Sequence, residues 1–217
     1  MEDQLKDDIH ISEGVILVSG GMDSTTLMYL FVSKGIDFKP LFINYGQHCA
    51  EKELKTLQSV LPKYYQEKLE IIDVSDIYRH SKSRFIKPAN LWQDDISADD
   101  LYIPYRNVLL LTIGASFAQT LGLKTIYSAF INSNHAKEID CSSDFFNKLG
   151  GLLSEYGSVQ IEMPFRNLSK YEVAKLGLKL KAPIGVTFSC QASPSIPCGA
   201  CPNCVDRLEA LRKIENE

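Results

Sequence analysis

The stretch VILVSGGMDS, residues 15–24, decides the fold that this chain is expected to adopt. Its first four residues form a short apolar run, which is typical of a buried strand. From Asp23 onward the pattern changes to a helical one, with Leu27, Leu30 and Phe31 at the spacing of a core-facing helix surface. A buried strand that passes through two glycines into a helix is the first half of a βαβ unit.

The two glycines in this stretch predict a site for an anion. Glycine lets a ligand approach the backbone closely, and the first amides of a helix point at an anion together with the positive end of the helix dipole. The hydroxyl groups of Ser19 and Ser24 add two more donors. The alternative is a tight strand–helix turn in which Asp23 and Ser24 only cap the helix. The stretch lacks the lysine of a P-loop and the third glycine of a dinucleotide fingerprint, which excludes both.

Strands and helices are expected to alternate along the rest of the chain, so we predict one α/β domain over residues 1–217 with a mostly parallel sheet. The expected strands are 15–19, 40–44, 69–74, 125–129 and 159–162, and the expected helices are 23–33, 50–61, 106–121, 144–156, 169–180 and 205–214. Residues 75–105 follow neither pattern. A connection of this length indicates a functional flap or an insertion.

Composition and charge exclude several classes of protein. The formal net charge is -4 over 217 residues, which does not indicate a nucleic acid partner. The acidic N-terminus lacks the basic and apolar regions of a signal peptide, and no apolar run approaches the roughly 20 residues that span a bilayer. Six cysteines without such a signal indicate a reducing compartment. We therefore expect a cytoplasmic protein without a membrane partner.

Four cysteines near the C-terminus predict a metal site. Cys190, Cys198, Cys201 and Cys204 are spaced C-x7-C-x2-C-x2-C, and two-residue gaps let a turn present successive thiolates to one ion. Zn²⁺ is the expected metal, held by the segment 186–217; an iron–sulfur cluster and unmetallated thiols are the alternatives. Four thiolates leave no open coordination position, so this metal is expected to stabilise the tail. Cys49 stands apart and is expected to be a small buried residue.

The residues SGGMDS resemble the SGGxDS loop of the PP-loop enzymes, which cleave ATP between its α- and β-phosphates. That resemblance implies a three-layer α/β/α fold with a five-stranded sheet, of the adenine nucleotide alpha hydrolase type. It also implies adenylation of a substrate with release of pyrophosphate. Asp23 is the expected partner of Mg²⁺, because a hard cation that bridges phosphates prefers a carboxylate.

Taken together, the motifs resemble the 7-cyano-7-deazaguanine synthase family over nearly the whole chain. The matching elements are Val18-Ser-Gly-Gly-Met-Asp-Ser-Thr-Thr26, Asn44-Tyr-Gly-Gln-His48, Ile103-Pro-Tyr-Arg-Asn107, Asp140-Cys141, Leu168-Ser-Lys170, Leu176-Gly177, Ser189-Cys190 and the three cysteines that follow. The resemblance implies an ATP-dependent carbon–nitrogen ligase that acts on 7-carboxy-7-deazaguanine. ATP would activate the carboxylate, ammonia would give the amide, and a second ATP would drive dehydration to the nitrile. A homodimer is the expected assembly.

The resemblance also assigns residues to the expected site. The nucleotide would bind Ser19, Gly20, Gly21, Met22, Asp23, Ser24, Thr25, Asn44 and Tyr45, with Asp23, Ser24 and Arg106 in catalysis; Arg106, Asn107, Asn132, His135, Lys137 and Asp140 would face the substrate. Arg106 is expected to neutralise the α-phosphate as pyrophosphate leaves, with a salt bridge at a helix start as the alternative. Tyr45 is a core residue in the alternative interpretation. Asp140 is expected to accept paired N–H donors from the deazapurine, or else to cap a helix.

The segment from Asn132 to Cys141 departs from the family pattern, because it contains His135 and Lys137 in place of an aromatic, glycine-containing stretch. Tyr105 likewise replaces a small residue. These departures favour, as a second hypothesis, a paralogue that couples the activated carboxylate to another amine, such as a protein or peptide terminus. Thiolation of tRNA and a non-catalytic nucleotide-binding subunit are further alternatives; the first would require a basic surface with salt-dependent RNA binding.

Overall fold

A computed structural model describes residues 9–88, 100, 102–131 and 141–217 of the chain. Its centre is a five-stranded sheet in which all pairs of neighbouring strands are parallel, in the order β3-β2-β1-β4-β5. The strands are β1 (Gly14–Leu17), β2 (Phe38–Asn44), β3 (Glu70–Asp73), β4 (Thr125–Tyr127) and β5 (Gln160–Glu162). Along the chain, β2 and β3 are added in turn on one side of β1, and β4 and β5 are then added on its other side. The predicted parallel α/β fold is confirmed.

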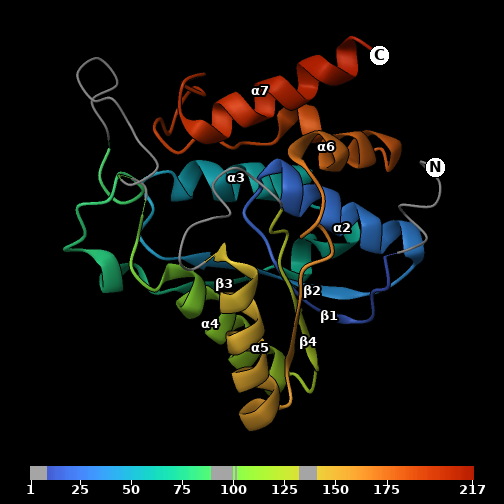
Figure 1. The fold of residues 1–217 in the computed structure, drawn as a ribbon, viewed down its shortest axis with the longest axis vertical. Coiled ribbons are helices and arrows are strands. Elements are labelled where there is room, and N and C mark those ends of the chain that lie inside the picture. The colour runs from blue at the N-terminus through green and yellow to red at the C-terminus, as the bar shows by residue number, and fades with distance from the viewer. Residues whose placement is uncertain (1–8, 89–99, 101, 132–140) are drawn as a thin grey trace.

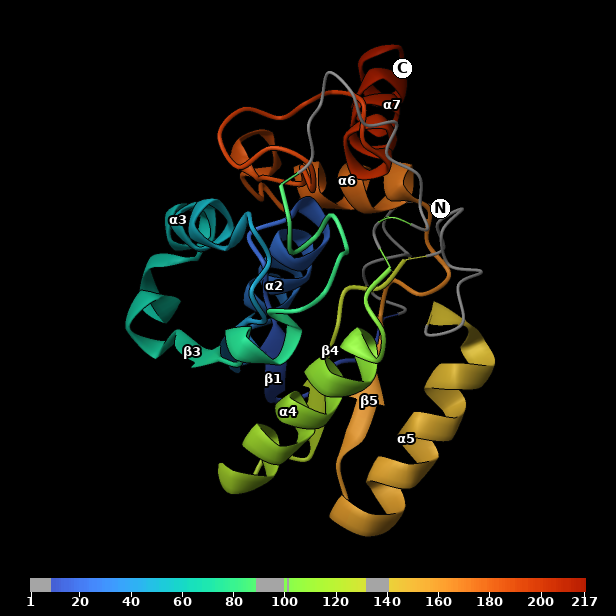
Figure 2. The same ribbon diagram turned by 90° about the vertical axis from the view of Figure 1, so that its left-hand side faces the viewer.

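Helices cover both faces of the sheet, which makes a three-layer molecule (Figures 1 and 2). One face carries α2 (Met22–Lys34), α3 (Ala50–Val60) and α6 (Lys170–Lys179), and α7 (Pro202–Glu215) packs on α6. The opposite face carries α4 (Arg106–Thr120) and α5 (Ser143–Gly157). Short 3-10 turns lie at Lys63–Lys68, Ser75–Tyr78 and Ile184–Val186. Among the residues that the structure describes, no helix is both long enough and apolar enough to cross a membrane.

The alternation of side chains along the strands builds the two cores. Ile16, Phe42 and Tyr127 face the cluster under α2 and α3, whereas their neighbours Val15, Leu41 and Ile126 face the cluster under α4 and α5. A strand in such a sheet is buried on both faces, which is why its sequence is a continuous apolar run. The central strands are therefore recognisable in the sequence without any alternation of polar and apolar residues.

Most predicted elements differ from the observed ones by one or two residues at their ends. The largest difference lies at the C-terminus, where α7 begins at Pro202 and the helix was expected only from residue 205. Proline is favoured in the first turn of a helix because that position needs no N–H donor. The helix therefore includes Cys204, one of the predicted metal ligands.

Candidate functional site

The loop between β1 and α2 has the backbone geometry of an anion site. Gly21 is the N-cap of α2, and no side chain caps the helix, so the amides of the first turn are not covered by a cap. The alternative in which Asp23 and Ser24 cap the helix is therefore wrong. Ser24 lies inside the loop instead: its Oγ donates to the Gly21 carbonyl oxygen (3.2 Å) and accepts the N–H of Ser19 (3.3 Å). These bonds fix the loop in one conformation.

Only a glycine fits at position 20 of this loop, because the loop packs directly against α3 there. Its φ is +73°, and a Cβ atom there would lie 2.7 Å from both the Glu53 carbonyl oxygen and the Leu57 nitrogen. A side chain at this position would therefore be strained and would also collide with the backbone of α3. This close contact between the loop and α3 places Glu53 and Leu57 beside the loop.

Asp23 makes an ion pair that the sequence did not reveal. Both of its carboxylate oxygens accept from Lys170 Nζ, at 2.7 and 2.9 Å, and both side chains are largely buried. Lys170 is the first residue of α6, whose N-cap Ser169 forms a capping box with Glu172. A lysine in the first turn of a helix is unfavourable because it faces the positive end of the dipole. A lysine at this unfavourable position is the one feature of the sequence that could have singled out Lys170.

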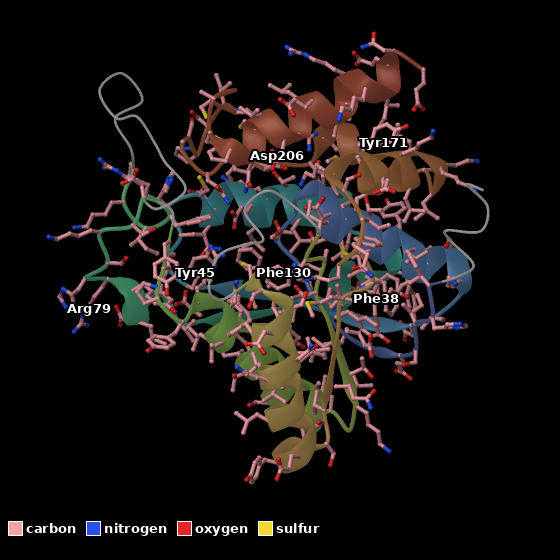
Figure 3. All side chains as sticks on the ribbon, in the orientation of Figure 1. Phe38, Tyr45, Arg79, Phe130, Tyr171 and Asp206 are labelled. Carbon is pink, nitrogen blue, oxygen red and sulfur yellow. The ribbon has the colours of Figure 1, made fainter. Side chains whose placement is uncertain are left out.

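A cavity of about 390 Å³ opens at the carboxyl ends of the strands, between β1 and β4. This is the point where the order of the strands reverses, and ligands of open α/β sheets bind there. The polar lining of the cavity includes Ser19, Asp23, Ser24, Tyr45, Gln47, Glu53, Arg106, Asn107, Ser128, Arg166, Lys170, Ser189, Gln191, Asn203 and Asp206. Figure 3 labels three of the lining residues: Tyr45 and Phe130 lie at the level of the sheet, and Asp206 lies above them on α7.

Arg106 and Asn107 begin α4 at the wall of this cavity. The Arg106 guanidinium lies 4.8 Å from the centre of the Phe85 ring, and its Nε donates to Asn107 Oδ1 at 3.3 Å. Asn107 is buried and donates to the Cys141 sulfur at 3.2 Å. Tyr45 is buried as a core residue would be, yet its side chain also lines the cavity, and burial raises the pKa of its hydroxyl.

Three of the predicted nucleotide-binding residues lie outside the cavity wall: Gly20, which packs against the backbone of α3, Asn44 and Thr25. Asn44 ends β2 and donates to Asp73 Oδ2 at 2.6 Å across to the neighbouring strand, so its amide is used inside the sheet. Thr25 is fully buried within α2. The structure thus brings Ser19, Gly21, Met22, Asp23, Ser24 and Tyr45 together at the cavity, but not Gly20, Thr25 or Asn44.

Glu53 is a cavity residue that the sequence analysis missed. It lies on α3 next to Gly20, and its Oε2 accepts from Gln47 Nε2 at 3.0 Å. Gln47 is itself held, because its Oε1 accepts the N–H of Tyr45 at 2.9 Å. Burial raises the pKa of the Glu53 carboxyl to about 6, against the opposing effects of the Gln47 hydrogen bond and the Arg106 charge. The only signal in the sequence was a glutamate that falls on the buried side of an amphipathic helix.

Arg166 joins the two ends of the segment that departs from the family pattern. Its Nη1 donates to the Ile131 carbonyl oxygen at 3.5 Å, and its Nη2 donates to the Cys141 carbonyl oxygen. The substrate residues predicted between these ends, Asn132, His135, Lys137 and Asp140, lie outside the described residues. The helix that follows is capped by Ser142, whose Oγ accepts from the Phe145 N–H at 3.1 Å.

The four predicted ligand cysteines converge on one point. The sulfur atoms of Cys190, Cys198, Cys201 and Cys204 all lie within 4.8 Å of one another. Backbone amides point at these sulfurs: Ala192, Ser193 and Cys198 donate to Cys190, and Cys201 donates to Cys198 at 3.2 Å. Amides directed at sulfur favour thiolates, which are the form that binds a metal. The donor set fits Zn²⁺ in tetrahedral coordination.

The cysteine cluster also positions one side of the cavity. Cys201 is the N-cap of α7, and the first turns of that helix place Pro202, Asn203 and Asp206 in the cavity wall. Arg207 fixes the helix to the preceding turn, because its Nη2 donates to the Ile184 carbonyl oxygen at 2.6 Å and its Nη1 donates to Thr187 Oγ1. Cys49 packs beside the cluster as a buried residue, with its pKa raised to about 12 by burial.

The fold and the glycine loop define an open α/β protein in which a loop with the backbone geometry of an anion site and a cavity lie together at the switch point of a parallel sheet. The family model for "Queuosine biosynthesis protein QueC" matches residues 13–215. The chain belongs to this family. The resemblance stated from the motifs is therefore confirmed.

Several relatives are similar over almost their whole length. Proteins named 7-cyano-7-deazaguanine synthase from Caldicellulosiruptor saccharolyticus, Picrophilus torridus and Chlorobaculum parvum are 32%, 31% and 30% identical; the aligned parts cover 92%, 93% and 93% of this chain and 91%, 87% and 92% of theirs. Among solved structures, an NMN synthetase from Francisella tularensis aligns with a TM-score of 0.47 at 18% identity, over 85% of this chain and 71% of that one.

Proposed function

We propose that the protein is an ATP-dependent ligase that converts the carboxylate of 7-carboxy-7-deazaguanine into a nitrile. ATP activates the carboxylate as an acyl-adenylate and releases pyrophosphate, ammonia displaces AMP to give the amide, and a second ATP activates the amide for dehydration. The observation that carries this proposal is the uncapped N-terminus of α2 at a cavity shared with Asp23, Arg106 and Lys170. Membership of the queuosine family supports the choice of substrate.

The phosphates of ATP are expected to bind at the loop of residues 19–24. The amides of the first turn of α2 and the dipole of the helix attract the anion. Mg²⁺ would supply charge neutralisation between the phosphates, and Asp23 is the carboxylate in position to hold it. In this structure Lys170 neutralises the charge of Asp23. If a metal ion neutralised Asp23 instead, the ammonium group of Lys170 could bind a phosphate oxygen. This exchange would make the site electrostatically complete only when nucleotide and metal are both bound.

Arg106 is expected to stabilise the charge that develops as pyrophosphate leaves. It begins α4 in the wall of the same cavity, and its guanidinium contacts the Phe85 ring and Asn107. A preorganised cation of this kind lowers the barrier because it needs no rearrangement during the reaction. Tyr45 is the candidate contact for the adenine ring, and the residues Asn132, His135, Lys137 and Asp140 are the candidates for the deazapurine.

A second candidate function is the coupling of the adenylate to another amine, such as a protein or peptide terminus. The unusual residues His135 and Lys137 in the substrate segment favour it. Both candidates share the activation step and differ only in the nucleophile. We also expect a homodimer, which light scattering on a sizing column measures directly.

The test is to incubate the protein with ATP, Mg²⁺, 7-carboxy-7-deazaguanine and ammonium, and to identify the products by mass spectrometry. The proposal expects pyrophosphate, AMP and a product lighter than the acid by the difference between a carboxyl and a nitrile group. Formation of AMP without any nitrogen-containing small molecule would favour the second candidate. Asp23→Ala is expected to abolish pyrophosphate release, whereas Asp144→Ala, at an exposed ion pair on α5, is the control and leaves it unchanged.

A further inference from the structure

Glu53 lies in the cavity wall, but it has no role in the proposed activation of the substrate carboxylate by ATP. The carboxylates that line the cavity within the described part of the chain are Asp23, Glu53 and Asp206. Asp23 is paired with Lys170, and Asp206 is carried by α7 at the cysteine-rich side. Glu53 lies instead beside the phosphate loop, because α3 touches Gly20 at the Glu53 backbone. Because Glu53 also lines the cavity, it lies near the place where the adenylate would form.

The two oxygens of this carboxylate are not equivalent. Gln47 donates to Oε2 at 3.0 Å, and Gln47 is itself fixed by the N–H of Tyr45. No hydrogen bond to Oε1 is present among the residues that the structure describes. An amidine edge of a purine needs both oxygens of a carboxylate at once. With one oxygen occupied, Glu53 suits a small cation that takes a single strong hydrogen bond.

The charges around Glu53 also favour a cation. Arg106 from α4 is the positive group that faces it, while Tyr45 after β2 and Cys49 before α3 are neutral because burial raises the pKa of both. When the phosphates of ATP enter the cavity, they compete for Arg106. Glu53 is then a buried negative charge without a full counter-charge, and a buried charge of this kind is costly unless it is paired.

We propose that Glu53 binds the ammonium ion and takes the proton that ammonium must lose before its nitrogen attacks the adenylate. This inference rests on the proposed function and adds the residue that delivers the nucleophile. Glu53 is suited to the task because a general base works best when its pKa lies near the operating pH. The pKa of about 6 keeps it ionised at neutral pH, yet makes it a stronger base than an ordinary carboxylate.

The proposed step balances in atoms and charge. Ammonium gives one proton to Glu53, and the nitrogen lone pair forms a bond to the carbonyl carbon of the adenylate. The bond from that carbon to the phosphate oxygen breaks, and AMP leaves with the electron pair. The new nitrogen then loses a second proton to solvent, which leaves the neutral amide. Neither oxidant nor reductant is needed.

The experiment compares wild type with Glu53→Gln in three reactions. Glutamine keeps the shape and the hydrogen bond from Gln47 but removes the charge. Exchange of labelled pyrophosphate into ATP in the presence of the acid measures activation and should stay within a few-fold of wild type. Formation of amide and nitrile from the acid and ammonium should fall by about 100-fold or more, the size of a general-base contribution. Conversion of the amide, supplied as substrate, to the nitrile should persist because that reaction needs no ammonia.

Two further measurements sharpen the test. In wild type the rate of ammonia transfer should rise as pH increases through about 6, because the carboxylate form is the base, and Glu53→Gln should lose this inflection. Glu51→Gln is the matched control, because it removes an exposed charge from the same helix and should behave as wild type. Equal loss of all three reactions, or an unchanged ammonia step, would overturn the inference. Failure of wild type to make amide or nitrile at all would overturn the proposed function with it.

Discussion

Replacement of Gly20 by alanine tests how tightly the phosphate loop is packed against α3. The φ of Gly20 is +73°, in the left-handed region. A Cβ atom would meet two backbone atoms of α3, the Glu53 oxygen and the Leu57 nitrogen, each at 2.7 Å. Backbone atoms inside a helix cannot rotate away as the end of a side chain can. The substitution must therefore shift either the loop or the helix.

The cost of Gly20→Ala follows from two terms. A residue with a Cβ in the left-handed region costs about 1–2 kcal/mol. Forcing an extra methyl group into a packed region costs about 1–3 kcal/mol more. The free energy of unfolding is therefore expected to fall by about 2–5 kcal/mol. For a domain of this size each kcal/mol lowers Tm by about 2–4 °C, so Tm should fall by about 4–20 °C.

Substitutions of two other glycines separate the conformational cost from the packing cost. All three variants are compared by calorimetry and by urea unfolding. Gly35 has a φ of +66° but nothing within 4 Å of an added Cβ, so Gly35→Ala should show only the conformational cost. Gly21 has a φ of -75°, and the nearest atom to an added Cβ is Ser19 Oγ at 3.3 Å, the end of a side chain that can rotate. Gly21→Ala should therefore change Tm less than Gly20→Ala does, while lowering pyrophosphate release, because its methyl group would meet the nucleotide. If Gly20→Ala lowers Tm no more than Gly35→Ala does, the argument from close packing is wrong.

Three further predictions concern the metal site, Lys170 and α7. Cys201→Ser should lose the bound metal and melt at lower temperature, whereas Cys49→Ser should keep the metal. Metal analysis of the two purified variants measures the metal content, and zinc rather than iron is expected. Lys170→Met should lower pyrophosphate release by about 100-fold, the loss expected for one preorganised electrostatic group, while Lys148→Met on the exposed face of α5 should not. A nearly normal rate for Lys170→Met would contradict its role at the phosphates. Arg207→Met should lower the free energy of unfolding by about 1.5–3 kcal/mol, because hydrogen bonds from a charged donor to Ile184 and Thr187 are lost, and exposed Arg212→Met is the control in urea unfolding.

Local signals in the sequence were sufficient for the elements of the fold. Each buried strand is a short apolar run, and helix ends carry chemical markers such as the capping box of Ser169 and Glu172. The glycine loop and the cysteine spacing were equally readable, because both depend on neighbours only a few residues apart. The one sizeable difference in a boundary lies at α7, because the cysteine spacing predicts a metal-binding turn around Cys201, whereas Cys201 and Pro202 also start the helix.

The contacts that complete the site could not be predicted in this way. Lys170 meets Asp23 across 147 residues of sequence, and Arg166 binds carbonyl groups at both ends of the segment from 131 to 141. In the sequence nothing distinguishes Glu53 from other glutamates on helices. Only the packing of α3 against Gly20 places it beside the loop. Conversely, Asn44 ends β2 at the same edge of the sheet as the cavity, but its side-chain amide donates a hydrogen bond to Asp73.

By itself, then, the sequence determined the class of fold, the glycine loop between β1 and α2 and the group of four cysteines, because short-range hydrophobic pattern and turn chemistry encode them. Only the tertiary structure decided which charges face one another in the cavity. That outcome depends on strand order and on the approach of α3, α6 and α7 to a loop far away in sequence. Periodicity along a chain carries no information about such distances, and packing between elements sets them.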